Sequence, residues 1–365
     1  MDDTTAAIYE RRARWWTAHR RPSRRRAARA FAGRLAERQP AGSVVADLGS
    51  GPGWYASDLP APVVAVDVAR AMLELTGENA PSALRVQADL EHLPFRRDGL
   101  GGAWAANSYV HLARTALPLA LADLHRSVVV GGLVHLRLLA GDYEGHQLPG
   151  DDLPGRFFAS WRPDRVADVL AGAGFDLVDL HAEPAAHGDR LVVEAVRVRS
   201  LPDYVGPGMR VLVVGLNPSL YAADAGVGFA RPGNRLWPAL AAAGLATRDR
   251  DPTHTLTVHR VGMTDLVKRA TTSARALTTD EYRAGFERVE RLAGWLRPAA
   301  VCFLGVTGWR EAVDPRSTLG WQSRLVGGRP AYMMPNPSGA NAHARLEDLV
   351  AHLRAAAAGP GLAQS

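Results

Sequence analysis

Short apolar segments alternate with helical segments along most of this chain. The first three span residues 44–48, 63–67 and 84–89, and each leads into glycines or ends in an aspartate. Strands that alternate with helices form a parallel sheet, because each helix returns the chain to the edge where the previous strand began. We therefore predict an α/β fold with a doubly wound sheet. Later strands are predicted at residues 102–106 and 132–138, after a Gly131-Gly132 turn, with a closing antiparallel pair at residues 175–180 and 190–198.

A second α/β pattern follows a linker that contains proline and glycine, residues 200–208. Its strands are predicted at residues 209–216, 301–304 and 331–334, and a terminal helix is predicted over residues 341–358. At roughly 150 residues per domain, 365 residues suffice for two domains with separate cores. We predict three regions, which are a basic helical arm over residues 1–43, a first domain over residues 44–199 and a second domain over residues 200–365.

Charge is distributed unevenly along the chain. Residues 1–43 hold eleven arginines and four acidic residues, a net charge of +7, whereas residues 44–200 carry −7 and residues 201–365 carry +6. Pro22 should divide the arm into two helices. The arm either contacts nucleic acid or covers a neighbouring pocket with a solvated outer face. The basic final block suits a polyanion such as DNA, although Lys268 is the only lysine and the excess of arginine also fits a biased composition.

Cysteine usage and hydropathy exclude several classes of protein. The single cysteine, Cys302, excludes an internal disulfide, a cysteine-based zinc site and a four-cysteine iron–sulfur cluster. We expect no metal site. No apolar run reaches about 18 residues, and no secretory signal is visible after Met1. We expect a cytoplasmic protein that does not contact a membrane.

A glycine-rich turn follows the first predicted strand, in the run Asp47-Leu-Gly49-Ser-Gly51-Pro-Gly53. Alternate glycines let the backbone pass close to a ligand, and the N-terminus of the next helix offers N–H donors. Asp67 ends the second strand, where a carboxylate can accept hydrogen bonds from both ribose hydroxyls. Asp89 ends the third strand, where it can reach the amine of an adenine. The pattern therefore predicts a nucleoside cofactor, but a dinucleotide fingerprint would need its last glycine at Trp54.

Residues 40–198 resemble the class I S-adenosylmethionine-dependent methyltransferases. The resemblance includes the glycine-rich run, Asp67, Ala88-Asp89, Gly131-Gly132 and Ala173-Gly174-Phe175. It implies S-adenosylmethionine as the cofactor, with the methionine part near Asp47, Gly49, Gly51 and Gly53, the ribose at Asp67 and the adenine at Asp89.

The methyl acceptor is not encoded in a motif. The first half has no cysteine, which excludes covalent methylation at C5 of a pyrimidine. Ala105-Ala106-Asn107-Ser108 stands where many base-amine methyltransferases carry their catalytic motif. His111 either lines the pocket or has a structural role.

Polar loops follow two predicted strands of the second half. The strand 211–214 leads into Gly215-Leu216-Asn217-Pro218-Ser219, and the strand 331–334 leads into Pro335-Asn336-Pro337-Ser338-Gly339-Ala340-Asn341. We expect the two strands to be neighbours, so that the loops form a crevice at their carboxyl ends. Phe229 and the segment Arg231-Pro-Gly-Asn234-Arg235-Leu-Trp237 lie between the two loops in the sequence.

Residues 201–358 resemble the mismatch-specific uracil/thymine DNA glycosylases of the uracil-DNA glycosylase superfamily. The resemblance implies double-stranded DNA with a mismatched or damaged base as the partner, with G·U the first expected substrate and G·T and damaged cytosines next. Such enzymes flip the nucleotide out of the duplex. By this resemblance Asn217 is catalytic and holds the attacking water, Phe229 stacks on the base, and no cofactor is needed. The remaining base- and DNA-binding candidates are Gly215, Leu216, Pro218, Asn234, Arg235, Asn336, Pro337, Ser338, Gly339 and Ala340.

Two residues depart from the pattern of this family. Ala340 stands where relatives commonly place a bulky apolar wedge, and Ser219 replaces a glycine. These departures leave an alternative open, in which a methyltransferase carries a non-catalytic DNA-binding module. No activated lysine is expected at either loop, so an active glycosylase should leave an abasic site without cutting the strand.

Overall fold

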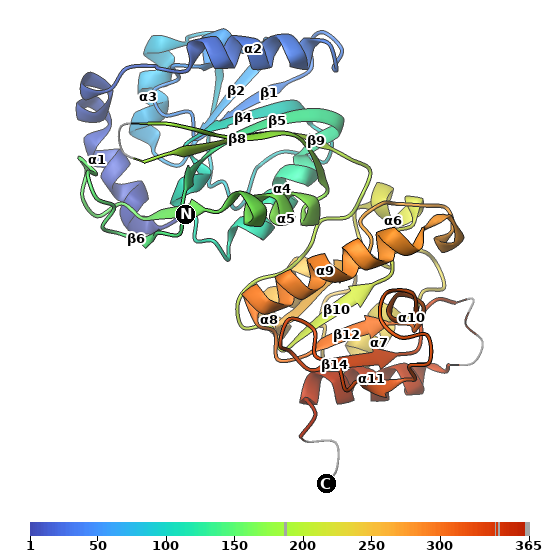
Figure 1. Cartoon of the computed structure of the whole chain (residues 1–365). Coiled ribbons are helices and arrows are strands. Elements are labelled where there is room, and N and C mark those ends of the chain that lie inside the picture. The colour runs from blue at the N-terminus through green and yellow to red at the C-terminus, as the bar shows by residue number, and fades with distance from the viewer. Residues whose placement is uncertain (186–187, 340, 342–343, 362–365) are drawn as a thin grey trace. The chain divides into compact units, whose positions relative to one another are not determined.

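The computed structural model describes residues 1–185, 188–339, 341 and 344–361. The chain divides into two compact units (Figure 1). Unit 1 contains Met1–Ala171 and Phe175–Val198, and unit 2 contains Gly172–Gly174 and the chain from Arg199 onward. Each unit is built on its own sheet, and both are α/β, which confirms the predicted fold class.

The sheet of unit 1 has the strand order β3-β2-β1-β4-β5-β7-β6, with β9 paired to β5 and β8 paired to β9. Strands β1 to β5 are mutually parallel, whereas the β8–β9 pair is antiparallel, as the sequence predicted. The strands are β1 (Val45–Leu48), β2 (Val63–Asp67), β3 (Leu84–Gln87), β4 (Leu100–Ala106), β5 (Val128–Ala140), β6 (Glu144–Gly145), β7 (Phe158–Trp161), β8 (Phe175–Glu183) and β9 (Arg190–Arg197).

The helices of unit 1 cover both faces of this sheet, with α2 on one side and α4 and α5 on the other (Figure 1). Helix α2 presents Ala28, Phe31 and Leu35 to a buried core that includes Trp104 and Leu133. The arm is divided around Pro22, as predicted, because α1 ends at His19 and α2 begins at Arg25. The helices are α1 (Asp3–His19), α2 (Arg25–Ala36), α3 (Arg70–Asn79), α4 (Leu117–Ser127) and α5 (Pro163–Gly172).

The predicted Gly131-Gly132 turn before a fifth strand is wrong. Strand β5 begins already at Val128 and runs through both glycines. Its register with β4 shifts between Leu100 and Gly102, and Gly131 has a φ of +83°. The glycine pair thus forms an irregularity inside the strand, because a residue with positive φ lets the chain bulge without leaving the sheet.

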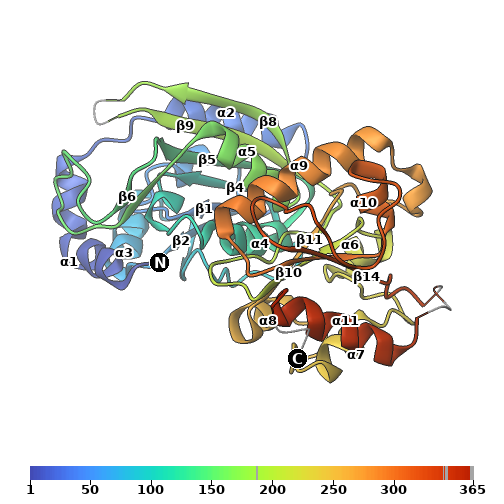
Figure 2. The ribbon, with the colours of Figure 1, turned by 60° about the horizontal axis from the view of Figure 1, so that its bottom comes forward.

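The sheet of unit 2 has the strand order β11-β10-β12-β14-β13 and is parallel except for β13. Helices α9 and α10 lie on one side of it and α7, α8 and α11 on the other (Figure 2). The strands are β10 (Val211–Gly215), β11 (Val261–Asp265), β12 (Val301–Leu304), β13 (Gly320–Trp321) and β14 (Ala331–Met334). The helices are α6 (Leu220–Ala225), α7 (Leu236–Ala242), α8 (Pro252–His259), α9 (Thr279–Leu296), α10 (Thr307–Ala312) and α11 (Leu346–Ala358).

Two expectations for unit 2 need correction. Strands β10 and β14 are not neighbours, because β12 lies between them and pairs with both. The terminal helix begins at Leu346 and not at Asn341. Asn341 instead closes the preceding loop, since its backbone N–H donates to the Ser338 carbonyl at 2.9 Å and its side chain donates to the Asn336 carbonyl at 3.0 Å.

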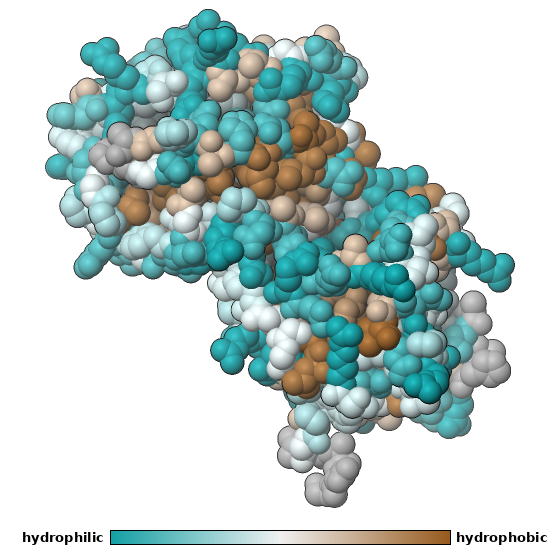
Figure 3. Space-filling model, in the orientation of Figure 1, coloured by the Kyte–Doolittle hydropathy of each residue, from teal (hydrophilic) through white to brown (hydrophobic). Residues whose placement is uncertain are grey.

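Apolar side chains gather on one face of unit 1, over the region of β8 and β9 (Figure 3). The exposed large apolar residues of this unit include Leu177 and Val178 of β8 and Val130 of β5. In the described part of the chain, no helix combines the length and the apolar character that a membrane crossing requires.

Candidate functional sites

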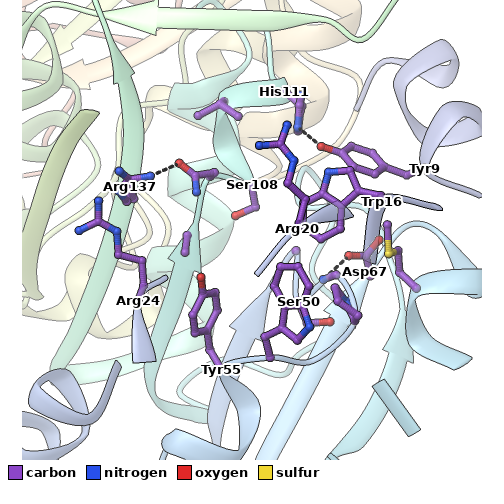
Figure 4. Close-up of a pocket in the computed structure, with 18 of the residues that line it drawn as sticks. Tyr9, Trp16, Arg20, Arg24, Ser50, Tyr55, Asp67, Ser108, His111 and Arg137 are labelled. Carbon is purple, nitrogen blue, oxygen red and sulfur yellow. Dashed lines mark hydrogen bonds between the residues drawn. The ribbon is translucent and has the colours of Figure 1, made fainter. Parts of the chain in front are cut away.

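A cavity of about 480 Å³ lies in unit 1 at the carboxyl ends of β1, β2 and β4 (Figure 4). The glycine-rich turn forms part of its wall through Gly49, Ser50 and Gly51. Asp67 from the end of β2 and Ser108 from the loop after β4 also line it. This is the edge where α/β folds bind ligands, because the loops that lead from the strands into the helices leave a crevice there.

The turn depends on its glycines for conformation and for space. Gly49 has a φ of +66°, and a Cβ at that position would lie 2.2 Å from the Cβ of Ser108. Gly53 has a φ of +77°, and a Cβ there would lie 2.7 Å from Thr76 Cγ2. Any larger residue would therefore push the turn away from β4 or α3 and change the wall of the cavity.

The Asp67 carboxylate, which can accept hydrogen bonds from a ligand, is fixed in position by backbone N–H groups. Its carboxylate accepts hydrogen bonds from the N–H groups of Gly51 at 2.8 Å and Ala69 at 2.9 Å. Burial raises the pKa of Asp67 to about 6 despite these donors. The carboxyl group is therefore mostly ionised at neutral pH, with lone pairs left for a ligand in the cavity.

Gly49, Gly51 and Asp67 share the cavity wall, but Asp47, Gly53 and Asp89 do not line it. Asp47 is buried in β1, where burial and the nearby Asp67 raise its pKa to about 8. Asp89 accepts a hydrogen bond from the amino group of Met1.

The N-terminal arm covers the cavity. Tyr9 and Trp16 of α1 and Arg20 and Arg24 of the following loop line it (Figure 4). The ring of Trp16 stacks on Trp54 with centroids 5.0 Å apart. Of the two interpretations left open for the arm, the structure therefore shows the one in which it covers a neighbouring pocket.

Arginines of the arm also pair with acidic residues of unit 1. Arg25 and Arg29 both donate to Asp58, at 2.7 and 2.8 Å. Arg34 donates through two nitrogens to Glu194 on β9. The positive arm and the negative block that follows it in the sequence are thus partners within one fold.

His111 lines the cavity and belongs to a chain of hydrogen bonds with Tyr9 and Arg156. Its Nδ1 donates to the Phe157 carbonyl at 2.7 Å, so Nε2 is the acceptor for the Tyr9 hydroxyl at 2.9 Å. Arg156 Nη1 donates to the Tyr9 oxygen at 2.7 Å. Burial lowers the pKa of His111 to about 4, so the ring is neutral at physiological pH.

The sequence reasoning missed several polar residues of this cavity. Tyr55, Asn107, Arg137 and Arg190 all line it. A signal was present for Arg137, which is the only charged residue in the apolar run of residues 133–140, where an unpaired charge would be costly. Asn107 belongs to the segment 105–108, which stands at the place of a catalytic motif in many base-amine methyltransferases. Tyr55 and Arg190 stand in segments whose composition is ordinary.

In unit 2, Asn217 stands just beyond the end of β10, and its side-chain nitrogen is held by three acceptors. Asn217 Nδ2 donates to Thr271 Oγ1 at 2.8 Å and to the carbonyls of Arg269 at 3.0 Å and Pro218 at 3.1 Å. This set of acceptors determines which end of the amide is nitrogen. Among the described residues, none donates to Oδ1, so that oxygen is available as an acceptor.

Phe229 lies beside the same strand end. A Cβ at Gly215 would lie 2.9 Å from Phe229 Cζ and 2.4 Å from Asp265 Oδ1, so the ring edge and the carboxyl group both approach the bare backbone of Gly215. Phe229 has a φ of +59°, which is unusual for a residue with a side chain and frequent at functional sites. Burial raises the pKa of Asp265, which the sequence reasoning did not select, to about 6.

The loops around residues 231–235 and 335–341 are joined by Arg235. Its backbone N–H donates to the Pro337 carbonyl at 3.0 Å, and its Nη2 donates to the carbonyls of Asn341 at 2.8 Å and Ser338 at 3.1 Å. Asn234 accepts from the N–H of Leu236 at 3.0 Å. The structure thus places Arg235 as a clamp on the loop that carries Asn336, Pro337, Ser338 and Gly339, and Ala340 lies outside the described residues.

Two family models match this chain. Residues 202–357 match the model described as the uracil DNA glycosylase superfamily, and residues 45–132 match a methyltransferase domain. The chain therefore contains a methyltransferase domain followed by a domain of the uracil DNA glycosylase superfamily, which confirms both resemblances at this level.

Several solved structures similar to the chain are described as methyltransferases. An S-adenosylmethionine-dependent methyltransferase of Methanosarcina mazei has 14% identity and a TM-score of 0.40, over 45% of this chain and 96% of its own. The 1,6-didemethyltoxoflavin-N1-methyltransferase of Burkholderia thailandensis has 22% identity and a TM-score of 0.42, over 53% of this chain and 85% of its own. The magnesium protoporphyrin IX methyltransferase of Synechocystis has 14% identity and a TM-score of 0.41, over 53% and 97%.

Proposed function

We propose that the chain is bifunctional, with a monofunctional DNA glycosylase in unit 2 and an S-adenosylmethionine-dependent methyltransferase in unit 1. The glycosylase would remove uracil, and with lower preference thymine or a damaged cytosine, from mismatched positions of duplex DNA in base-excision repair. The observation that carries this half is the fixed amide of Asn217. With its nitrogen bound to three acceptors, the side chain offers its oxygen to a water molecule.

In the proposed reaction, the flipped base stacks on Phe229 and the water held by Asn217 attacks C1′ of the deoxyribose. The bond between C1′ and the base nitrogen breaks, a C1′–oxygen bond forms, and the base leaves as an anion stabilised by backbone N–H donors of the first loop. The proton that the attacking water loses ends on the departed base, so the products are a C1′ hydroxyl and the neutral base. An amide is a poor base, so we expect slow turnover. Lys268 donates to Asp203 Oδ1 at 2.8 Å and is held away from substrate chemistry, which supports a product with an intact strand.

The first prediction tests this reaction with Asn217→Ala. An end-labelled duplex with one G·U pair is incubated with the full chain and then treated with hot alkali. We expect wild type to yield a cut at the uracil. The variant should lose at least about 100-fold of the base-release rate, as when one positioned group is removed from an active site, and should keep duplex binding.

Equal base release by wild type and Asn217→Ala would contradict the assigned residue. Measurable duplex binding without an abasic product in wild type would instead favour the non-catalytic DNA-binding module.

For unit 1, the residues of the cavity fit S-adenosylmethionine. The turn at Gly49 leaves a space that a side chain would fill, and Asp67 presents a carboxylate for the ribose hydroxyls. The buried hydroxyl oxygens of Ser50 and Ser108, which line the cavity, have no partner among the described residues. The cofactor would supply an electrophilic methyl group on a sulfonium. Asp67 would orient the nucleoside, and Tyr9 and Trp16 would exclude water from the cavity.

The second prediction tests cofactor binding at Asp67 by calorimetry with S-adenosylhomocysteine. We expect Asp67→Asn to weaken binding by roughly 10- to 100-fold, because hydrogen bonds to an ionised acceptor contribute about 1.5–3 kcal/mol. In wild type the affinity should also fall below pH 6, where Asp67 becomes protonated, whereas the variant should lack this dependence. Asp176→Asn, at an exposed aspartate of β8, is the matched control. Unchanged binding by Asp67→Asn would refute this site.

A further inference from the structure

Three arginines from separate segments converge at one end of the cavity in unit 1. Arg24 precedes α2, Arg137 lies on β5 and Arg190 begins β9, and all three line the cavity. In the β5–β9 register Arg137 is opposite Val192 and Leu139 is opposite Arg190. Arg137 and Arg190 are thus diagonal neighbours on one face of the sheet, where long side chains meet.

Among the described residues, the carboxylates beside this group number fewer than its guanidinium groups. Arg24 Nη1 lies 2.5 Å from Glu183 Oε2, and Arg137 Nε lies 3.7 Å from the same oxygen. Asp189 adds one more negative charge, and it acts on Arg190. Three guanidinium groups therefore share two carboxylates, and the group keeps a net positive charge.

Hydrogen-bond donors of this group also lack acceptors. Arg137 Nη1 donates to Asn107 Oδ1 at 2.8 Å, but the Nε atoms of Arg137 and Arg24 are buried without a hydrogen-bond partner among the described residues. The Arg137 side chain is only 8% exposed, so water does not readily replace the missing acceptors.

The electrostatic consequence for Arg137 is a lowered pKa. Burial, reinforced by the positive charges of Arg24 and Arg190, lowers the pKa of Arg137 to about 10. A guanidinium with a depressed pKa gains stability when an anion approaches, because the anion offsets both the burial and the like charges.

We infer that this arginine group, Arg24, Arg137 and Arg190, binds a carboxylate or phosphate group of a small-molecule methyl acceptor. The inference rests on the methyltransferase function proposed above and names the substrate class of the same site. Figure 4 shows Arg24 and Arg137 with Tyr55 at one side of the cavity, Asp67 and Trp16 at the other, and Ser108 between them. The arginines thus lie away from the nucleoside end, where the acceptor has room.

The burial of the group favours a small molecule over a nucleic acid. A duplex presents its phosphates on an extended backbone that needs an open, exposed surface. Here the Arg24 side chain is 23% exposed and that of Arg137 is 8% exposed, inside a cavity that also holds the cofactor residues. A single anionic group of a compact molecule can enter such a space.

The test uses the full chain saturated with S-adenosylhomocysteine, titrated calorimetrically with malonate and separately with inorganic phosphate at constant ionic strength. We expect wild type to bind at least one of the two anions, and the preferred anion distinguishes a carboxylate from a phosphate acceptor. Arg137→Gln should weaken that binding at least tenfold. Arg70→Gln removes the same charge from an exposed arginine of α3 outside the cavity and should bind as wild type does.

Binding of S-adenosylhomocysteine is measured first in every variant, so that the two proposals fail separately. If wild type does not bind S-adenosylhomocysteine, the methyltransferase function fails, and titration of the chain alone still reports whether the arginine group binds anions. If S-adenosylhomocysteine binds but neither anion does, or if Arg137→Gln binds the anion as wild type does, the inference is overturned.

Two further measurements test whether a loss of anion binding comes from misfolding and whether the methyl acceptor is a nucleic acid. Arg24→Gln changes a loop residue outside the sheet, and we expect the same loss of anion binding with S-adenosylhomocysteine affinity retained. Methyl transfer from labelled S-adenosylmethionine to duplex DNA or to RNA would overturn the small-molecule class.

Discussion

Asn217 shows how one side chain is oriented by groups that are themselves fixed. Thr271 Oγ1 accepts from Asn217 Nδ2 at 2.8 Å and donates to the Ser273 carbonyl at 3.0 Å, so the hydroxyl hydrogen is already used in the second bond. The hydroxyl can therefore act only as an acceptor toward the amide. A carboxylate at position 217 would place an oxygen against these three acceptor oxygens and would have no hydrogen to donate to them. An amide therefore suits this position better than a carboxylate.

The third prediction concerns Thr271→Val, which removes one of the three acceptors of the amide. We expect base release from a G·U duplex to fall roughly fivefold, since one neutral hydrogen bond contributes about 1 kcal/mol. Duplex affinity should not change, because Thr271 would act only through Asn217. Thr257→Val, at an exposed position of helix α8, is the matched control. A proportional loss of duplex affinity would indicate a general structural effect and contradict the positioning role.

At the scale of elements, helix α2 is held to its sheet by packing and by charge. Phe31 and Leu35 are buried against the sheet, and Arg34, which is 45% exposed, pairs with Glu194, which is 8% exposed. His135 Nδ1 lies 3.5 Å from the same carboxylate, but burial lowers the pKa of this histidine. Glu194 therefore depends on Arg34 for its compensating positive charge.

The fourth prediction is that Arg34→Ala destabilises unit 1 by roughly 2–4 kcal/mol, because it leaves a buried carboxylate without its cation. The transition of unit 1 in differential scanning calorimetry should fall by roughly 5–10 °C. Arg14→Ala is the control on the same arm, since Arg14 and Glu78 are 79% and 58% exposed and such a pair contributes little. Equal shifts for the two variants would contradict the importance of the buried carboxylate.

Also at the scale of elements, β12 lies between β10 and β14 and separates the two polar loops. The two polar loops are thus one strand further apart than predicted, and Gly305 at the end of β12 lies beside Asn336. Gly305 has a φ of +89°, and a Cβ there would lie 3.2 Å from Asn336 Cβ. The absence of a side chain allows the loop after β14 to approach the end of β12.

At the scale of the whole molecule, each unit has a core of its own. One cluster in unit 2 packs α7 and α11 with β10 to β14, and another in unit 1 packs α2 with β1, β2 and β4. Arginines of the arm form ion pairs with acidic residues of the following block inside unit 1. The net charge of +6 over residues 201–365 therefore stays available for a polyanion.

The fifth prediction is that the full chain unfolds in two calorimetric transitions that respond to different ligands. S-adenosylhomocysteine at 100 times its Kd should stabilise unit 1 by about 2.7 kcal/mol. That transition should then rise by roughly 5–10 °C while the other stays in place. The effect should be absent in Asp67→Asn. A single transition that shifts as a whole would show that the two units unfold together.

Local patterns in the chain sufficed for the fold class, the division of the arm at Pro22 and most strands. These features depend on neighbouring residues, since periodicity, proline and glycine act over a few positions. Gly49, Gly51 and Asp67 are close together for the same reason, because each ends or follows a strand of one parallel sheet. Their common place in the cavity wall could be anticipated from the order of the strands.

The arginine group and the β12 insertion could not be anticipated in this way. More than a hundred positions separate Arg24 from Arg137, and about fifty separate Arg137 from Arg190. They meet only because the β5–β9 register sets Arg137 and Arg190 on one face of the sheet. A shift of one residue in that register would turn Arg190 to the opposite face. The amino-acid order thus dictated the elements and their ends, whereas long-range pairing of strands decided which charges share a cavity, because register is a property of two segments and is not encoded in either one alone.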